Sequence, residues 1–366
     1  MSDKRLNYAD MMKGIAILFV VIYHLIAPCT LKTIISHIMP ASLITFFFYA
    51  GFFYKPHTKT FGERLKARAK ALLVPFFKFS LIFWLIGSFV LVIKKEETIQ
   101  EALYCLRNFF IGSIWNRSIQ DFFGWEYYSM GKRYFFLADF WFLLALMLAS
   151  ILFFIIADYV LKSKAKTIIT AVLLFAVTGV LRGFEISLPY NLQLIPFWTG
   201  FLLLGAFANQ YSLFDHPKLK GRREIVIAIV CIVCGALICA FHKPDINMFR
   251  GTFNKIEVVS MILDTVSSLL LIYGVSVLFK RIEMAGVRVK ELSWLGAHSL
   301  TFYLYHMFIA WIICQITGFS VIYKEPVESK TVVYSFIVLA VCMIVCILRA
   351  VIADKISKKI AERKGT

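Results

Sequence analysis

The chain has 366 residues, of which 60% are hydrophobic and 17% charged, and its mean hydropathy is +0.76. A soluble domain is nearer half apolar and a quarter charged, so this composition excludes a soluble enzyme, a disulfide scaffold and a disordered tail. Lys and Arg number 40 against 22 Asp and Glu, a formal net charge of +18. We expect the excess in loops facing an anionic membrane, with no nucleic-acid partner, because the chain consists largely of long apolar runs.

Ten apolar segments are each long enough to cross a membrane, which takes about 20 helical residues. The sequence therefore predicts an all-α polytopic transmembrane helical bundle of about ten spans, with residues 1–366 forming a single membrane domain. The longest break between spans, 94–138, is predicted to be an extracytoplasmic loop with room for interfacial helices. The predicted spans are 14–30, 38–55, 72–93, 139–160, 167–183, 190–207, 225–241, 258–279, 296–317 and 331–351.

The distribution of basic residues predicts the orientation of the chain. If the N-terminus is cytoplasmic, the inside connections hold 23 Lys and Arg and the outside connections 13, six of them in 94–138. Cytoplasmic loops carry the excess of such residues, so both termini are predicted cytoplasmic and 352–366 is a basic cytoplasmic tail. The first apolar run is expected to be a retained span rather than a cleaved signal peptide, because Pro28 stands where a cleavage site needs a small residue.

Ionisable residues within predicted spans are candidate functional residues, because a charge in hydrocarbon is costly without a partner or a cavity. Lys13 and His24 are eleven positions apart in the first span. On a helix this spacing returns to within roughly 20° of the same direction, about 16 Å along the axis. It predicts a cation near the cytoplasmic surface and an imidazole at mid-membrane. A lone histidine more often makes an interhelical hydrogen bond, but the aligned lysine favours a functional site.

Ser299, Tyr303 and His306 form a second polar stripe, at positions i, i+4 and i+7 of the ninth span. These positions lie on one face of a helix. A hydroxyl, a phenol and an imidazole there are consistent with the lining of a reaction cavity. They are equally consistent with a packing stripe that makes hydrogen bonds between helices.

A basic connection precedes the third predicted span. Arg64 and Arg68 are four residues apart, as are Lys66 and Lys70, so a helix here presents two cationic ridges able to bind phosphates. Most basic cytoplasmic loops serve only to set topology, which is the commoner interpretation for the run alone.

The remaining candidate groups are carboxylates and thiols. Asp139 and Asp264 lie near or within spans, and the sequence does not indicate their partners. Most cysteines, including Cys231 and Cys234, are surrounded by apolar residues. They are interpreted as small packing side chains rather than a zinc or disulfide site, and no metal is expected.

Several motifs resemble those of the acyltransferase family 3 membrane proteins. Asp10-Met-Met-Lys13 through Tyr23-His24 is similar to the opening signature of that family, in which ten positions separate a basic residue from a histidine. The similarity extends over almost the whole chain. The further matching segments are the aromatic-glycine run 46–53, the segment 68–76 in which basic residues precede Pro75, Trp141-Phe-Leu, and Leu295 through His306.

Two features depart from the common family pattern. Many members carry Arg where this chain has Lys13, which keeps the charge but loses bidentate geometry. Some members also carry a C-terminal esterase-like domain, whereas this sequence ends about 15 residues after its last predicted span. The outline is that of the membrane-only form, similar to fucose 4-O-acetylase-like proteins.

The resemblance implies transfer of an acyl group, usually acetyl, from cytoplasmic acyl-CoA to a hydroxyl of an envelope or exported glycan or glycolipid. It implies the bacterial cytoplasmic membrane as the location, with membrane lipid as surroundings. His24 is then the general base or a transient acyl carrier, since imidazole titrates near neutrality. The CoA phosphates would be bound by Lys13, Arg64, Arg68 and Lys70. The cavity would be completed, or the oxyanion stabilised, by Ser299, Tyr303 and His306.

The main alternative is a proton-coupled transporter or flippase of a glycan or small solute, because transporters also place His, Asp and Lys inside the membrane. The sequence shows no clear repeat between its halves and no pair of helices broken by Gly or Pro, which disfavours that class. A membrane scaffold without chemistry leaves the two polar stripes unexplained. No pattern indicates the acceptor or the oligomeric state.

Overall fold

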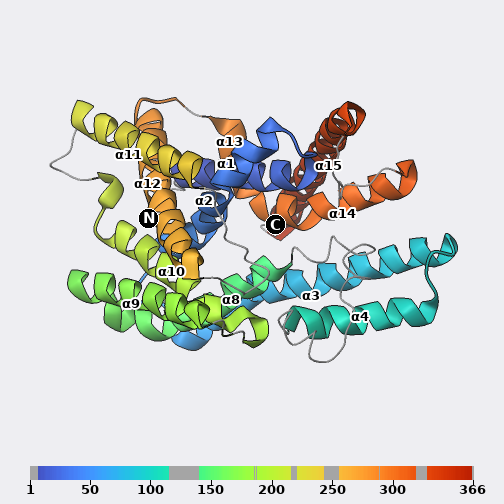
Figure 1. Cartoon of the computed structure of the whole chain (residues 1–366), viewed down its shortest axis with the longest axis horizontal. Coiled ribbons are helices and arrows are strands. Elements are labelled where there is room, and N and C mark those ends of the chain that lie inside the picture. The colour runs from blue at the N-terminus through green and yellow to red at the C-terminus, as the bar shows by residue number, and fades with distance from the viewer. Residues whose placement is uncertain are drawn as a thin grey trace. The chain divides into compact units, whose positions relative to one another are not determined.

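The computed structural model describes residues 7–114, 140–184, 186, 188–215, 221–242, 255–287, 289–318 and 328–364. These residues form helices, and no strand occurs among them (Figure 1). Ten of the helices in these ranges are long and apolar enough to cross a membrane, and each overlaps one of the ten predicted segments. The prediction of a polytopic helical bundle is therefore confirmed.

The chain divides into two compact units, Met1–Ser42 with Leu278–Thr366, and Leu43–Val277. The boundaries fall within α2 (Thr30–Phe52) and α12 (Lys255–Met284). The first unit also contains α1 (Asn7–Leu25), α13 (Lys290–Ala297), α14 (Ser299–Thr317) and α15 (Ser329–Lys364). The second contains α3 (Phe61–Ile93), α4 (Ile99–Ile114), α8 (Trp141–Val160), α9 (Lys164–Gly183), α10 (Ile195–Gln210), α11 (Arg222–Phe241), and the 3₁₀ helices Pro189–Leu194 and Leu213–Asp215.

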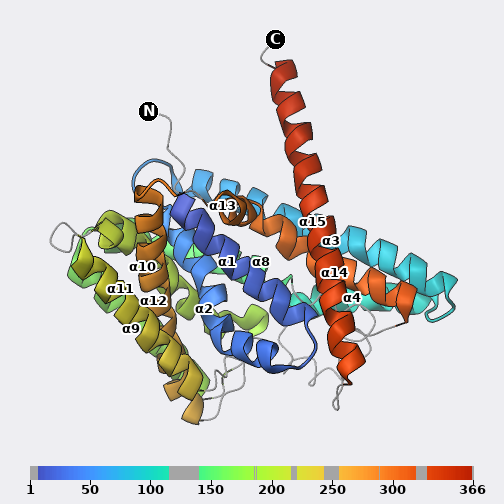
Figure 2. The same ribbon diagram turned by 90° about the horizontal axis from the view of Figure 1, so that it is seen from above.

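In the first unit, α1 packs against α13, α14 and α15, and α15 crosses α14 (Figure 2). Two glycines bring α1 and α13 into backbone contact. A Cβ atom on Gly14 would lie 2.2 Å from the carbonyl oxygen of Leu292, and one on Gly296 would lie 1.7 Å from that of Asp10. Small residues at such crossings let membrane helices approach closely, which fixes α1 firmly against α13.

In the second unit, α8 packs against α3 and α10, and α10 also packs against α9. The helices α3 and α4 lie side by side as a hairpin (Figure 1). A second glycine pair joins the end of α2 to α10, since a Cβ on Gly51 would lie 1.9 Å from the oxygen of Leu202 and one on Gly205 1.8 Å from that of Phe48. Beside it, the ring of Phe47 stacks on Trp198 at 4.3 Å between centroids.

The surface of α3 supports the membrane assignment. Its outward face carries a stripe of exposed apolar side chains at helical spacing, Val74, Phe77, Leu81, Leu85 and Phe89. A soluble protein rarely exposes a continuous apolar patch of this kind, whereas a lipid-facing helix requires one.

Helix ends differ from the predicted bounds for local reasons. The first span begins at Asn7 and ends at Leu25 rather than at 30, since Pro28 disfavours helical geometry at the residue before it. The third helix begins at Phe61 rather than 72, because Thr60 and Glu63 form a capping box at its start. The basic run is thus part of α3.

Two predicted regions are partly described. Within 94–138 the structure has α4, and most of the predicted tail 352–366 continues α15 as far as Lys364. Residues 115–138, and Asp139 with them, lie outside the described residues. The orientation of the termini and an interfacial position for α4 stay predictions.

Candidate active site

Helix α1 carries Lys13 and His24 on one face, as the eleven-residue spacing predicts for a continuous helix. The Nζ atom of Lys13 lies 2.7 Å from Oδ1 of Asp10, one turn earlier on the same helix. Asp10 is only 4% exposed. A buried charge needs a partner, so this carboxylate holds the ammonium group of Lys13 in place. The role of Asp10 was not predicted above, although its i, i+3 spacing from Lys13 is a sequence signal for this contact.

His24 lies in the last turn of α1, which corrects the expected mid-span position because the helix ends at Leu25. Two residues further on, the Ile26 carbonyl accepts a hydrogen bond of 2.9 Å from the ammonium of Lys32. Lys32 is a charged residue beside this turn that the sequence analysis did not single out.

The central feature of the site is a pair of histidines from α1 and α14. The ring centroids of His24 and His306 are 5.5 Å apart. The ring centroid of Tyr303 lies 6.4 Å from that of His306, at one helical turn on α14. The structure therefore brings together three of the predicted site residues. In the sequence, His24 lies at least 279 positions before the other two.

The backbone around His306 fixes its tautomer. Its Nδ1 lies 2.9 Å from the carbonyl oxygens of both Phe302 and Tyr303. A carbonyl only accepts, so Nδ1 carries the proton and the lone pair of the neutral ring is on Nε2. His306 is 1% exposed, and its own carbonyl accepts a hydrogen bond of 3.4 Å from the thiol of Cys342 on α15.

Ser299 is separated from this group. It opens α14, seven residues or about 10 Å along the helix axis from His306. Among the described residues, no hydrogen bond joins Ser299 to the histidine pair. The predicted stripe is therefore on one helix, but only its Tyr303 and His306 end lies beside His24.

His298, the residue before Ser299, makes contacts that link two helices. Nδ1 of His298 lies 2.8 Å from the carbonyl oxygen of Trp294, and Nε2 lies 3.0 Å from Oδ1 of Asp354. Both partners are hydrogen-bond acceptors, so each ring nitrogen of His298 faces an oxygen atom. The side chain of His298 joins the start of α14 to α15, a contact that was not predicted from the sequence.

The basic run of α3 packs against α8 through its arginines. Nη1 of Arg64 donates to Oδ2 of Asp158 at 2.9 Å, and the hydroxyl of Tyr54 donates to Oδ1 of the same carboxylate at 2.6 Å. The guanidinium also lies 4.7 Å from the centroid of the Tyr54 ring. Burial, followed by the hydrogen bond to Asp158, raises the pKa of Tyr54 above its ordinary value, so the phenol keeps its proton.

The four cations proposed from sequence thus have different surroundings. Arg64 is 7% exposed, and its Nη2 has no hydrogen-bond partner among the described residues, which leaves a buried donor suited to an anion. The guanidinium of Arg68 lies 6.0 Å from the ring centroid of Phe154, whereas Lys70 is exposed. These three residues belong to the second unit and Lys13 to the first.

The structure shows a partner for Asp264 of α12, which the sequence did not indicate: His242, directly after α11. Nε2 of His242 lies 3.9 Å from Oδ1 of Asp264, which is buried in the first third of α12. This pair belongs to the second unit, whereas the histidine pair of α1 and α14 belongs to the first. Asp139, the other carboxylate, is outside the described residues.

Comparison with known proteins gives the family. The model of acyltransferase family 3, described as an acyltransferase domain, matches residues 6–351. No curated protein and no solved structure matches the chain. The matched range includes α1, the basic part of α3 and the whole of α14, and it covers nearly all of the sequence. The chain is therefore a membrane protein that belongs to acyltransferase family 3.

Proposed function

We propose that this acyltransferase moves an acetyl group from cytoplasmic acetyl-CoA to a hydroxyl of an envelope or exported glycan, as the fucose 4-O-acetylase-like outline of the sequence suggests. The observation that carries the proposal is the pair of His24 and His306, placed 5.5 Å apart by helices distant in sequence. Two imidazoles at this separation supply the proton transfer that ester formation from an alcohol requires.

In the proposed reaction, His24 removes the proton of the acceptor hydroxyl while its oxygen attacks the thioester carbonyl. The C–S bond then breaks, and the CoA sulfur leaves with the proton returned from the imidazolium. The lone pair on Nε2 of His306 is a hydrogen-bond acceptor that can orient His24, and the phenol of Tyr303 is the hydrogen-bond donor proposed to stabilise the tetrahedral oxyanion. A two-step route, in which the acetyl group rests briefly on His24, uses the same residues.

The proposed donor site uses cations to bind the CoA phosphates. Lys13, held by Asp10, lies about 16 Å along α1 from His24, a separation that the pantetheine arm of CoA spans. The buried Nη2 of Arg64 is a second hydrogen-bond donor proposed to bind a phosphate, because Asp158 and Tyr54 hold the rest of that side chain in place. Arg68 and Lys70, on the same end of α3, add positive charge.

Transfer of labelled acetyl from acetyl-CoA in isolated membranes tests the proposal. His24→Ala and His306→Ala are each expected to slow transfer to glycan by a factor of about 100 or more, the typical contribution of general acid–base catalysis. His37→Ala on α2 is the matched control, because it removes an imidazole outside the pair, and it is expected to leave the rate unchanged. Normal transfer by the His24→Ala protein would refute the assignment.

A further inference from the structure

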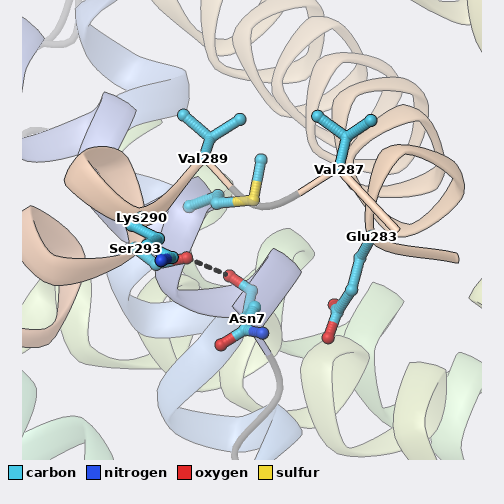
Figure 3. A pocket seen from close by; sticks show the side chains of 7 residues that line it. Asn7, Glu283, Val287, Val289, Lys290 and Ser293 are labelled. Carbon is cyan, nitrogen blue, oxygen red and sulfur yellow. Dashed lines mark hydrogen bonds between the residues drawn. The ribbon is translucent and has the colours of Figure 1, made fainter. Parts of the chain in front are cut away.

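A pocket of about 300 Å³ lies in the first unit, where the start of α1 meets the end of α12 and the start of α13. Its polar lining residues are Asn7, Glu283, Lys290 and Ser293, and its apolar ones are Met11, Val287 and Val289 (Figure 3). The volume is at the lower end of the range for small-molecule sites. A lining of polar and apolar residues suits a ligand in which a small polar group is joined to an apolar part.

The two charged residues stand on different walls of the pocket. Glu283 projects from the end of α12 on one side of Asn7, with Lys290 and Ser293 on the other (Figure 3). Oε2 of Glu283 accepts a hydrogen bond of 3.0 Å from the backbone N–H of Tyr8, and the hydroxyl of Ser293 donates to the carbonyl of Asn7 at 3.2 Å. These bonds fix the shape of the pocket.

Glu283 and Lys290 make no ion pair with each other or with any other residue in the described part of the chain. Each charge nevertheless faces the same small space. A ligand that carries both an ammonium group and an anion satisfies the two together, whereas a ligand of one sign meets repulsion from one of them.

The pocket is separate from the proposed acyl-transfer face. On α1, Met11 points about 160° away from Lys13 and about 140° away from His24. Glu283 would also repel the phosphates of CoA. The pocket therefore needs a different occupant from the acyl donor.

We propose that the pocket binds the head group of an aminophospholipid of the phosphatidylethanolamine type, with its ammonium against Glu283 and its phosphate against Lys290. The site lies at the ends of two membrane-spanning helices, since Asn7 is the first residue of one and Glu283 the last but one of another. This places it at the level of lipid head groups. Met284 and Val287 are exposed apolar side chains beside it, available to an acyl chain. These features favour a lipid over a soluble zwitterion.

Native mass spectrometry of the full-length protein from nanodiscs tests this proposal. The nanodiscs contain phosphatidylethanolamine, phosphatidylcholine or phosphatidylglycerol. The ammonium of phosphatidylcholine has no N–H to donate, and phosphatidylglycerol has no ammonium group. The wild-type protein is expected to retain phosphatidylethanolamine in preference to both. Glu283→Gln and Lys290→Gln are each expected to lower that retention about tenfold, the effect of losing one charge-assisted hydrogen bond.

The substitutions are chosen to change charge while keeping side-chain size and hydrogen-bonding capacity. Glutamine at 283 still accepts the hydrogen bond from Tyr8, so only the charge is lost. Glu291→Gln and Lys359→Gln remove the same charges from exposed positions outside the pocket and are expected to leave retention unchanged. Equal retention of all three lipids by the wild-type protein, or an undiminished preference in Glu283→Gln, would overturn the proposal. Displacement of the bound lipid by soluble phosphoethanolamine at comparable concentration would overturn the assignment to a lipid.

Discussion

The contact between Lys13 and Asp10 illustrates how this protein keeps a charge inside a membrane helix. The two side chains are one turn apart and 2.7 Å from each other, with the carboxylate buried. The ammonium is therefore oriented before any ligand arrives, which reduces the entropy lost when a phosphate binds. Asp10 acts as a positioning residue for Lys13 in the proposed donor site.

Substitutions of Lys13 test this role at the level of one residue. Lys13→Gln is expected to raise the KM for acetyl-CoA about tenfold, because one charge-assisted contact to phosphate is lost. Lys13→Arg keeps the charge and gains a bidentate geometry, so its KM is expected to stay within about threefold of the wild-type value. Initial rates in membranes measure both. Lys162→Gln, an exposed lysine before α9, is the control, and an equal change in that variant would show that net charge alone is responsible.

Sequence spacing could predict which residues share a helix face but not which faces meet. Lys13 with His24, and Tyr303 with His306, follow from periodicity within α1 and α14. The approach of His24 to His306, and of Arg64 to Asp158, depends on packing between helices that are far apart in the chain. Periodicity contains no such information, so Asp158, Tyr54 and His298 were not identified from the sequence.

At the scale of the helices, the predicted number of spans was correct because a membrane span is set by length and apolar content alone. Helix ends were less accurate because caps and prolines determine them, as at Thr60 and Pro28. The shift at α1 places His24 in the last turn of the helix rather than near its middle.

The glycine contact between α1 and α13 provides a test of helix packing. Gly14→Ala and Gly296→Ala each place a methyl group against a backbone oxygen, at 2.2 and 1.7 Å, so the helices must separate. We expect each to lower the free energy of unfolding by about 1–3 kcal/mol, the usual cost of overpacking, measured as a lower midpoint of thermal unfolding in detergent.

Gly62→Ala in α3 is the matched control for these substitutions. No atom lies within 4 Å of a Cβ at that position, so alanine is expected to be neutral or stabilising by up to about 1 kcal/mol. If Gly14→Ala and Gly296→Ala unfolded at the same temperature as the wild-type protein, the close contact of α1 with α13 would be contradicted.

At the scale of the whole molecule, the excess of positive charge serves two purposes in this account. Most of the 40 Lys and Arg residues are expected to set the orientation in the membrane. A small set, Lys13, Arg64, Arg68 and Lys70, is proposed to bind the CoA phosphates, and Lys290 is proposed to bind a lipid phosphate. The apolar composition is explained by the ten helices that are long and apolar enough to span a membrane.

The central claim is that this chain acetylates a glycan through His24. The most direct test is mass spectrometry of envelope glycans from a strain that lacks the gene, complemented with the wild-type, His24→Ala or His37→Ala protein. We predict acetylated glycan with the wild-type and His37→Ala proteins, and glycan that lacks the acetyl group in the deletion strain and with His24→Ala. Identical acetylation of the glycans in all four strains would contradict the account.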